Sequence, residues 1–124
     1  MNLNSVLIGS ENPQRLAEYY TKLFGTPVME GEGDTYTTWV LGNGAVTVGP
    51  HDQVKGKNAQ PGRVIWNVES DDVKGDATRF AAAGAIVVAE PYTAGDSGDY
   101  WIATFADPDD NYFQLVSPYN PEAM

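Results

Sequence analysis

The second half of the chain repeats the first half, and this duplication is the strongest constraint on the fold. A shift of sixty positions aligns three pairs of residues: Ser10 with Ser70, Asn12 with Asp72, and Tyr20 with Phe80. After one residue is dropped, Gly25 aligns with Gly84. The hairpins that close the two halves, residues 37–48 and 102–116, also correspond. Similarity at a fixed spacing predicts two copies of one structural unit.

Each half is predicted to contain one strand, one helix and three further strands. Asn12 and Pro13 begin a helix over residues 13–24, because asparagine caps free N–H groups and proline tolerates the first helical position. Gly25 ends this helix, since glycine readily leaves the helical conformation. A second helix is expected over residues 73–83.

Strands are predicted from short apolar runs and the turns between them. In the first half they are expected over residues 3–8, 28–29, 36–41 and 45–48. The second half closes with a hairpin, Trp101 to Leu115, whose turn over residues 107–111 is rich in proline and aspartate. In its last strand, the two-residue period places Tyr112 and Gln114 on one face. Residues 90–98 are expected to form a loop.

The repeat predicts a single domain over residues 1–124. Its modules are residues 1–50 and 63–118, joined by a linker over residues 51–62 that has little apolar content. One βαβββ module cannot bury both faces of its sheet by itself. We therefore expect an α+β fold in which two βαβββ modules form a curved eight-stranded mixed sheet. The helices would cover the outer face, and the concave inner face would hold a ligand.

Composition excludes several classes of function and location. Seventeen acidic and seven basic side chains give a net charge of −10, which repels nucleic acids and anionic membrane surfaces. The absence of cysteine excludes disulfides and a thiol nucleophile. The first residues lack a signal sequence and no apolar run is long enough to span a membrane, so we expect a cytoplasmic protein. Exposed sheet edges favour a homodimer.

The duplicated pattern, closing on Asp107-Pro108-Asp109-Asp110-Asn111, resembles the vicinal oxygen chelate superfamily. This superfamily includes glyoxalase I, extradiol dioxygenases, and fosfomycin- and bleomycin-resistance proteins. The resemblance covers residues 3–118, and it departs from the family at Asp110, where a glycine is usual. Asp110 can adopt the same left-handed conformation at modest cost.

Metal-using members of this superfamily place four side chains, drawn from His, Glu and Gln, on inner-face positions of four strands. The resemblance carries these positions to Asn4, to Val46 or Thr47, to Val64 or Ile65, and to Gln114. Amide and apolar side chains are weak ligands for divalent metals. We therefore expect no metal and no other cofactor. The one histidine, His51, is expected to be a solvated linker residue.

Aromatic residues on the predicted strands favour a binding cavity on the inner face. Trp66 alternates with Val64 and Val68, and Tyr112 lies beside Gln114. The complete predicted ligand-binding set is Asn4, Val6, Trp39, Val46, Val64, Trp66, Trp101, Tyr112 and Gln114. The alternative is that these aromatic residues fill the core or a subunit interface.

Three functions are consistent with the sequence. The preferred one is a metal-independent small-molecule binding protein of the glyoxalase and bleomycin-resistance type, which sequesters an antibiotic or another toxic metabolite. Its ligand would be aromatic or cationic, because aromatic rings and the acidic charge favour both. The second is a metal-dependent lyase or dioxygenase of the same superfamily, whose site is displaced by one strand residue. The third is a module whose concave face serves assembly.

Overall fold

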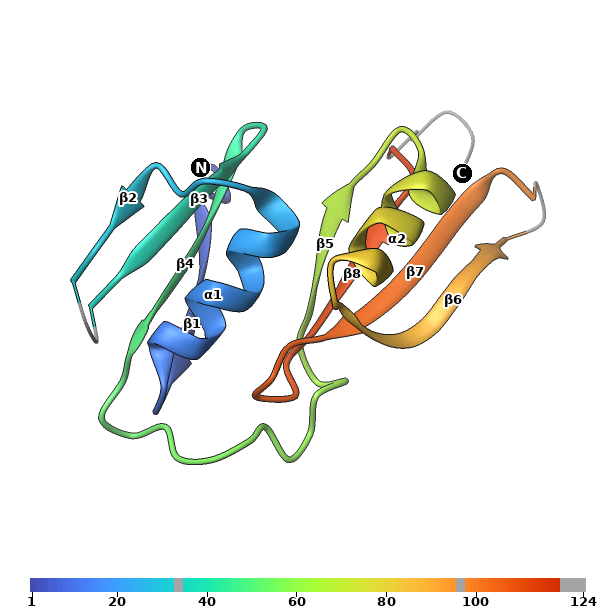
Figure 1. The fold of residues 1–124 in the computed structure, drawn as a ribbon. Helices are drawn as coiled ribbons and strands as arrows, with labels where there is room; N and C mark the ends of the chain where they lie inside the picture. Colours follow the sequence, from blue (N-terminus) through green and yellow to red (C-terminus); the bar gives the residue numbers. More distant parts are fainter. Residues whose placement is uncertain (33–34, 96–97, 119–124) are drawn as a thin grey trace. The chain divides into compact units, whose positions relative to one another are not determined.

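A computed structural model describes residues 1–32, 35–95 and 98–118. The chain divides into two compact units (Figure 1). Unit 1 consists of Met1–Ala59 together with Pro108–Asp110, and unit 2 consists of Gln60–Asp107 with Asn111–Met124. Pro108–Asp110 therefore belong to unit 1, although they come about fifty positions after its main segment in the sequence.

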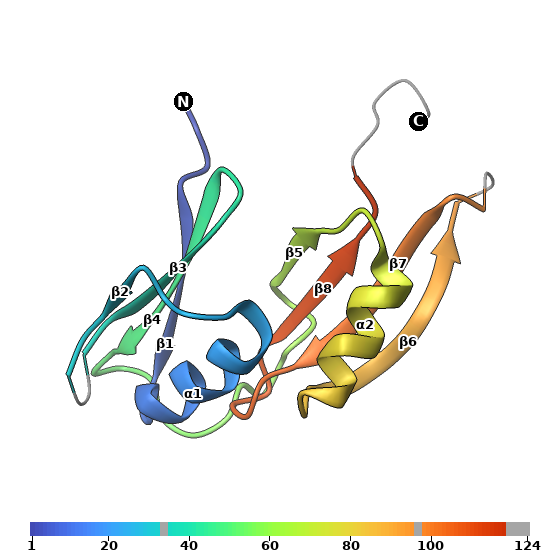
Figure 2. The same cartoon turned by 45° about the horizontal axis from the view of Figure 1, so that its top comes forward.

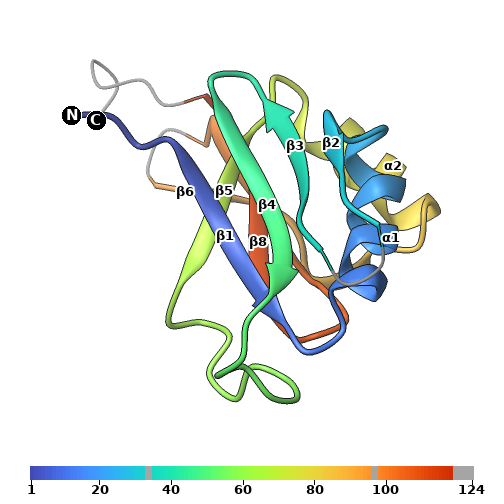
Figure 3. The same cartoon turned by 90° about the vertical axis from the view of Figure 1, so that its left-hand side faces the viewer.

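Unit 1 is a four-stranded sheet with one helix. Its elements are β1 (Ser5–Ser10), α1 (Pro13–Phe24), β2 (Met29–Glu30), β3 (Thr37–Leu41) and β4 (Gly44–Pro50). The strand order is β1-β4-β3-β2, and Figure 3 shows β1, β4 and β3 side by side. The β1–β4 pair is parallel and the other pairs are antiparallel.

Unit 2 has the same topology. Its elements are β5 (Ile65–Glu69), α2 (Val73–Ala82), β6 (Ile86–Ala94), β7 (Tyr100–Ala106) and β8 (Tyr112–Val116). The strand order is β5-β8-β7-β6, and α2 packs against β6, β7 and β8 (Figure 2). The predicted α+β fold of two βαβββ modules is confirmed. In the described part of the chain, eight strands form two four-stranded sheets, one in each unit, whereas the sequence predicts one sheet.

Helix α1 has the predicted limits because its ends are encoded locally. The side chain of Asn12 accepts a hydrogen bond from the Arg15 N–H, and Gly25 has a φ of 87°, which suits glycine. The buried residues of α1 are Pro13, Leu16, Tyr19, Tyr20 and Leu23, and the last four share one face. No helix in residues 1–32, 35–95 and 98–118 is long and apolar enough to cross a membrane.

Strand β6 corrects one prediction. The sequence predicts a loop over residues 90–98, but β6 continues to Ala94, and residues 96–97 of that range lie outside the described residues. Its pairing with β7 shifts register between Val87 and Ala89 and again between Ala89 and Tyr92. Such irregularities tolerate Pro91, which has no N–H to donate, and the strand can therefore continue past it.

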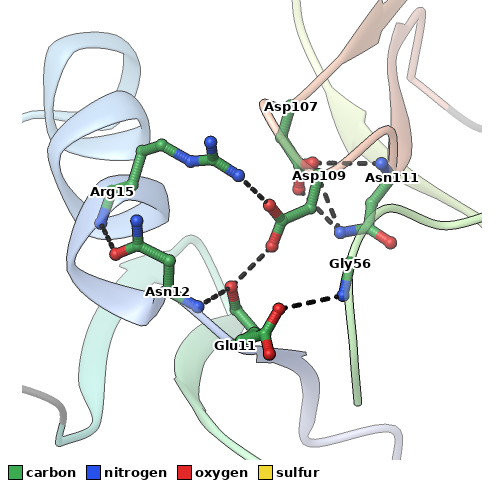
Figure 4. Close-up of polar contacts among 8 residues, drawn as sticks. Glu11, Asn12, Arg15, Gly56, Asp107, Asp109 and Asn111 are labelled. Carbon is green, nitrogen blue, oxygen red and sulfur yellow. Dashed lines mark hydrogen bonds and ion pairs between the residues drawn. The ribbon is translucent and has the colours of Figure 1, made fainter.

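The turn between β7 and β8 supplies a buried carboxylate to unit 1 (Figure 4). Asp109 is 5% exposed, and its Oδ2 accepts a hydrogen bond of 2.5 Å from Ser10 Oγ. Its Oδ1 accepts from the guanidinium of Arg15, and its backbone oxygen accepts from the Asn58 N–H at 2.7 Å. Ser10 Oγ in turn accepts from the Asn12 N–H at 2.9 Å. Asp109 therefore stabilises the start of α1.

The same turn is closed by its own side chains. Asp107 is fully buried, and its carboxylate accepts hydrogen bonds from the backbone and side-chain N–H groups of Asn111 at 3.0 Å (Figure 4). Asp110 has a φ of 63°, the left-handed conformation that the sequence comparison allowed for an acidic residue at this position. The turn geometry is therefore encoded by Asp107 and Asn111.

We expect Asp109→Ala to lower the free energy of unfolding by about 2 kcal/mol, because it leaves the buried hydroxyl of Ser10 without its acceptor. Asp71→Ala removes the same charge from an exposed position and should change stability by less than about 0.5 kcal/mol. Urea denaturation followed by tryptophan fluorescence measures both. Equal losses in the two variants would show that the buried contacts of Asp109 contribute nothing.

Candidate functional site

The packing of α2 determines which side chains of β8 face the helix. Phe80 of α2 contacts Phe105 and Phe113, with ring centroids 5.5 and 6.4 Å apart. Because successive residues of a strand alternate between faces, Tyr112 and Gln114 point away from α2. The prediction that these two residues share one face is confirmed. We call the face of the unit 2 sheet that points away from α2 the open face.

Cross-strand pairing arranges the open face into three rows. The central row is polar and contains Asn67, Gln114 and Thr104. One flanking row contains Ile65, Tyr112 and Ala106, and the other contains Glu69, Val116 and Ile102. A narrow polar strip therefore lies between two rows that are largely apolar.

A hydrogen bond orients the central row. Gln114 Nε2 donates to Thr104 Oγ1 at 2.9 Å. Thr104 is 5% exposed and Gln114 is half-buried, so this bond is shielded from bulk water. Asn67 is paired with Gln114 on the other side and is exposed. The row presents hydrogen-bonding groups without a net charge.

Three predicted ligand-binding residues of unit 2 lie elsewhere. Trp66 is paired with Phe113 and stacks on its ring, with centroids 5.0 Å apart, so Trp66 lies on the α2 side. Trp101 is on the same side, because Lys74 of α2 lies 4.1 Å from its ring centroid. Val64 precedes β5 and is 74% exposed. The prediction that Trp66 and Gln114 share a face is wrong.

The predicted residues of unit 1 show the same error. Val46 is paired with both Val6 and Trp39, so these three side chains share a face. Trp39 is 1% exposed and contacts Tyr20 of α1, with ring centroids 6.1 Å apart. These residues therefore form core beneath α1. Asn4 precedes β1, and its carbonyl accepts a hydrogen bond from the Ala45 N–H at 3.2 Å.

The face of the unit 1 sheet that points away from α1 carries a different row. It contains Leu7, Thr47 and Thr38, which occupy the positions of Asn67, Gln114 and Thr104 in the repeat. Thr38 Oγ1 and Thr47 Oγ1 are hydrogen-bonded at 2.9 Å, as Thr104 and Gln114 are in unit 2. The alternatives Thr47 and Ile65 therefore lie on the faces of the two sheets that point away from the helices.

Sequence reasoning missed Asn67 and Thr104. The shift of sixty positions aligns Asn67 with Leu7, so the repeat alone places Asn67 on a predicted strand. The signal for Thr104 was weaker, since it depends on the register between β7 and β8. The sequence around a threonine in a hairpin strand does not show which residue of the neighbouring strand it will be paired with.

The side chains of these rows are poor metal ligands. The described residues contain no group of three or more His, Cys, Asp and Glu side chains placed to hold a metal ion. The two row positions on β1 and β4 carry Leu7 and Thr47, and those on β5 and β8 carry Asn67 and Gln114. Divalent transition metals prefer imidazole, thiolate and carboxylate donors, so this set does not fit such an ion.

Comparison with known proteins gives a consistent result. The chain matches the family model described as Glyoxalase-like domain over residues 5–116. No curated protein matches it. Its fold is similar to that of a glyoxalase-related enzyme from Fulvimarina pelagi, with 16% identity, a TM-score of 0.71, and coverage of 95% of this chain and 88% of that chain.

Two further solved structures have the same fold. A glyoxalase/bleomycin resistance protein/dioxygenase family enzyme from Burkholderia phytofirmans PsJN is 17% identical with a TM-score of 0.70, and the alignment covers 94% of this chain and 98% of that chain. A glyoxalase / bleomycin resistance protein from Catenulispora Acidiphila DSM 44928 is 15% identical with a TM-score of 0.68, covering 95% and 100%. At these identities the similarity concerns the fold.

We expect Trp66→Ala to lower the free energy of unfolding by about 2 kcal/mol, because it removes a ring stacked on Phe113. Val64→Ala is the matched control, since its exposed side chain should be replaced at a cost below about 0.5 kcal/mol. Urea denaturation followed by circular dichroism measures both. A Trp66→Ala protein as stable as the parent would contradict the placement of Trp66 in the core.

Proposed function

Because the chain belongs to the Glyoxalase-like domain family, within the vicinal oxygen chelate superfamily, we propose that it binds a small organic molecule on the open face of unit 2. The observation that carries this proposal is the hydrogen-bonded pair of Gln114 and Thr104 at the centre of that face. In this proposal the protein sequesters its ligand, such as an antibiotic or another toxic metabolite, and does not transform it.

The arrangement of the open face suits binding. Protein ligand sites are largely apolar and contain a few polar groups that orient the ligand. Here Ile65, Ile102 and Tyr112 supply apolar surface on either side of the polar row. Carboxamides and hydroxyls do not exchange protons near neutral pH, so the row can orient a ligand but is poorly suited to general acid or base catalysis.

The donor set argues against metal chemistry at these positions. Leu7, Thr47, Asn67 and Gln114 provide neither a carboxylate nor an imidazole, so they would hold a divalent cation weakly. A metal-dependent lyase or dioxygenase of the same superfamily would need such a site. We therefore treat metal-dependent activity as the outcome that would overturn the proposal.

Thermal unfolding tests the two functions together. We expect no rise in the melting temperature with Ni²⁺, Zn²⁺, Mn²⁺ or Fe²⁺, and a rise with members of a panel of neutral and cationic bicyclic aromatic compounds, because a ligand that binds only the folded state stabilises it by mass action. The rise should persist in EDTA. A metal-dependent rise that EDTA abolishes would contradict the proposal.

A pair of substitutions locates the binding face. We expect Tyr112→Ala to weaken binding of the best aromatic compound by about tenfold, because a stacked ring is lost, whereas Tyr112→Phe keeps the ring and should bind within about twofold of the parent. Isothermal titration calorimetry measures both affinities. Unchanged binding by Tyr112→Ala would place the ligand elsewhere.

A further inference from the structure

We infer that the open face selects an uncharged ligand whose polar edge is a cis amide, such as a lactam or a primary carboxamide. In such an edge an N–H donor and a C=O acceptor lie side by side and point the same way. This inference rests on the proposed binding function and adds the chemical class of the ligand. It is carried by the direction of one hydrogen bond and by the burial of its acceptor.

The protein would bind the N–H of this ligand edge through the oxygen of Gln114. A carboxamide has two N–H donors and one oxygen acceptor. In Gln114, Nε2 donates to Thr104 Oγ1 at 2.9 Å, which engages one N–H and leaves the second N–H and Oε1. Oε1 accepts no hydrogen bond from the described part of the chain, so it is the atom that offers an acceptor to a ligand N–H.

The protein would bind the C=O of the ligand edge through the hydroxyl of Thr104. Its oxygen accepts from Gln114, which leaves its own proton to be donated. Within residues 1–32, 35–95 and 98–118 no acceptor receives that proton, although Thr104 is only 5% exposed. A buried donor without an acceptor is costly, and a ligand carbonyl would remove the cost. Thr104 Oγ1 lies beside the carboxamide that carries Oε1, because it accepts from Nε2 of the same group at 2.9 Å.

The side chains around the polar row disfavour anionic ligands and can contact a flat ring. The three rows of the open face contain one carboxylate, that of Glu69, and no lysine or arginine, and the whole chain has a net charge of −10. An anionic ligand would therefore meet repulsion without a compensating partner. The ring of Tyr112 and the side chain of Ile65 lie beside the polar row, where they can cover an aromatic system fused to the amide.

Matched ligands test the inference without changing the protein. The probes are 2-quinolinone, which has a cis amide edge, N-methyl-2-quinolinone, which lacks the N–H, and the N-methylquinolinium cation. Titrations of the ¹⁵N-labelled full chain, followed by heteronuclear NMR, give both the affinity and the location. We expect 2-quinolinone to shift the side-chain amide signals of Asn67 and Gln114 and to bind at least about tenfold more tightly than the other two probes.

Two variants extend the test to the protein side. Thr104→Val removes the hydroxyl with little change of shape, and it should weaken 2-quinolinone by about tenfold and also weaken the N-methyl compound, because both carry the carbonyl that accepts from this hydroxyl. Thr78→Val makes the same substitution on the exposed surface of α2 and should bind both probes as the parent does. The NMR spectrum shows whether each variant is folded. If Thr104→Val does not fold, the comparison of the three probes on the parent protein still tests the inference.

The outcomes separate the inference from the proposed function. If the probes shift signals of the open face but 2-quinolinone binds no more tightly than N-methyl-2-quinolinone, or the cation binds most tightly, the amide-edge inference is overturned and the binding function remains. If no probe shifts signals of the open face, the amide-edge inference fails. If all the shifts then map to other surfaces of the protein, the proposed site fails as well.

Discussion

The aromatic stack beneath α2 is the interaction on which the candidate site depends. Phe80 packs on Phe105, Phe105 stacks on Phe113 at 5.5 Å, and Trp66 stacks on Phe113 from the neighbouring strand. Burial of these rings holds Phe113 toward the helix, and the two-residue period of β8 then turns Gln114 the other way. The polar row is therefore a consequence of the packing on the opposite side of the sheet. A change of register by one residue would bury Gln114 and expose Phe113.

In both units the helix side of the sheet is packed with aromatic residues, but the opposite faces carry different side chains. In unit 1, Trp39 and Tyr20 form the buried contact, and the other side of the sheet carries Leu7 where unit 2 carries Asn67. The starts of the helices diverge as well. Ser70 donates to Asp76 of its own helix at 2.6 Å, whereas Ser10 donates to Asp109, which lies 99 positions away in the sequence. The duplicated backbone therefore supports two different sets of side-chain partners, and unit 2 has the amides Asn67 and Gln114 where unit 1 has Leu7 and Thr47.

Local signals predicted the helices well and the strand faces unevenly. Asn12, Pro13 and Gly25 encode both ends of α1 within a few residues, so its limits could be read directly from the sequence. Alternation shows which residues of a strand share a face, but it does not show which face the helix covers. For β8 the apolar Phe113 and Leu115 resolved this, while in β5 both Trp66 and Ile65 are apolar and the choice was wrong. The partner of Asp109 was not predictable, because it depends on tertiary packing between distant segments.

The neutrality of the polar row has a physical consequence for recognition. A net charge of −10 disfavours anions over the whole surface, but exposed charges are screened beyond about 10 Å at moderate ionic strength and cannot distinguish ligands of similar shape. Discrimination at contact distance must then come from the pattern of donors and acceptors. One N–H of Gln114 is engaged by Thr104, and the oxygen of the same amide can accept a hydrogen bond. A ligand that places its own acceptor against this oxygen brings two acceptors together without a donor between them. The hydrogen bond within the protein thus engages one of the two N–H donors of the amide and leaves its oxygen to accept from a ligand.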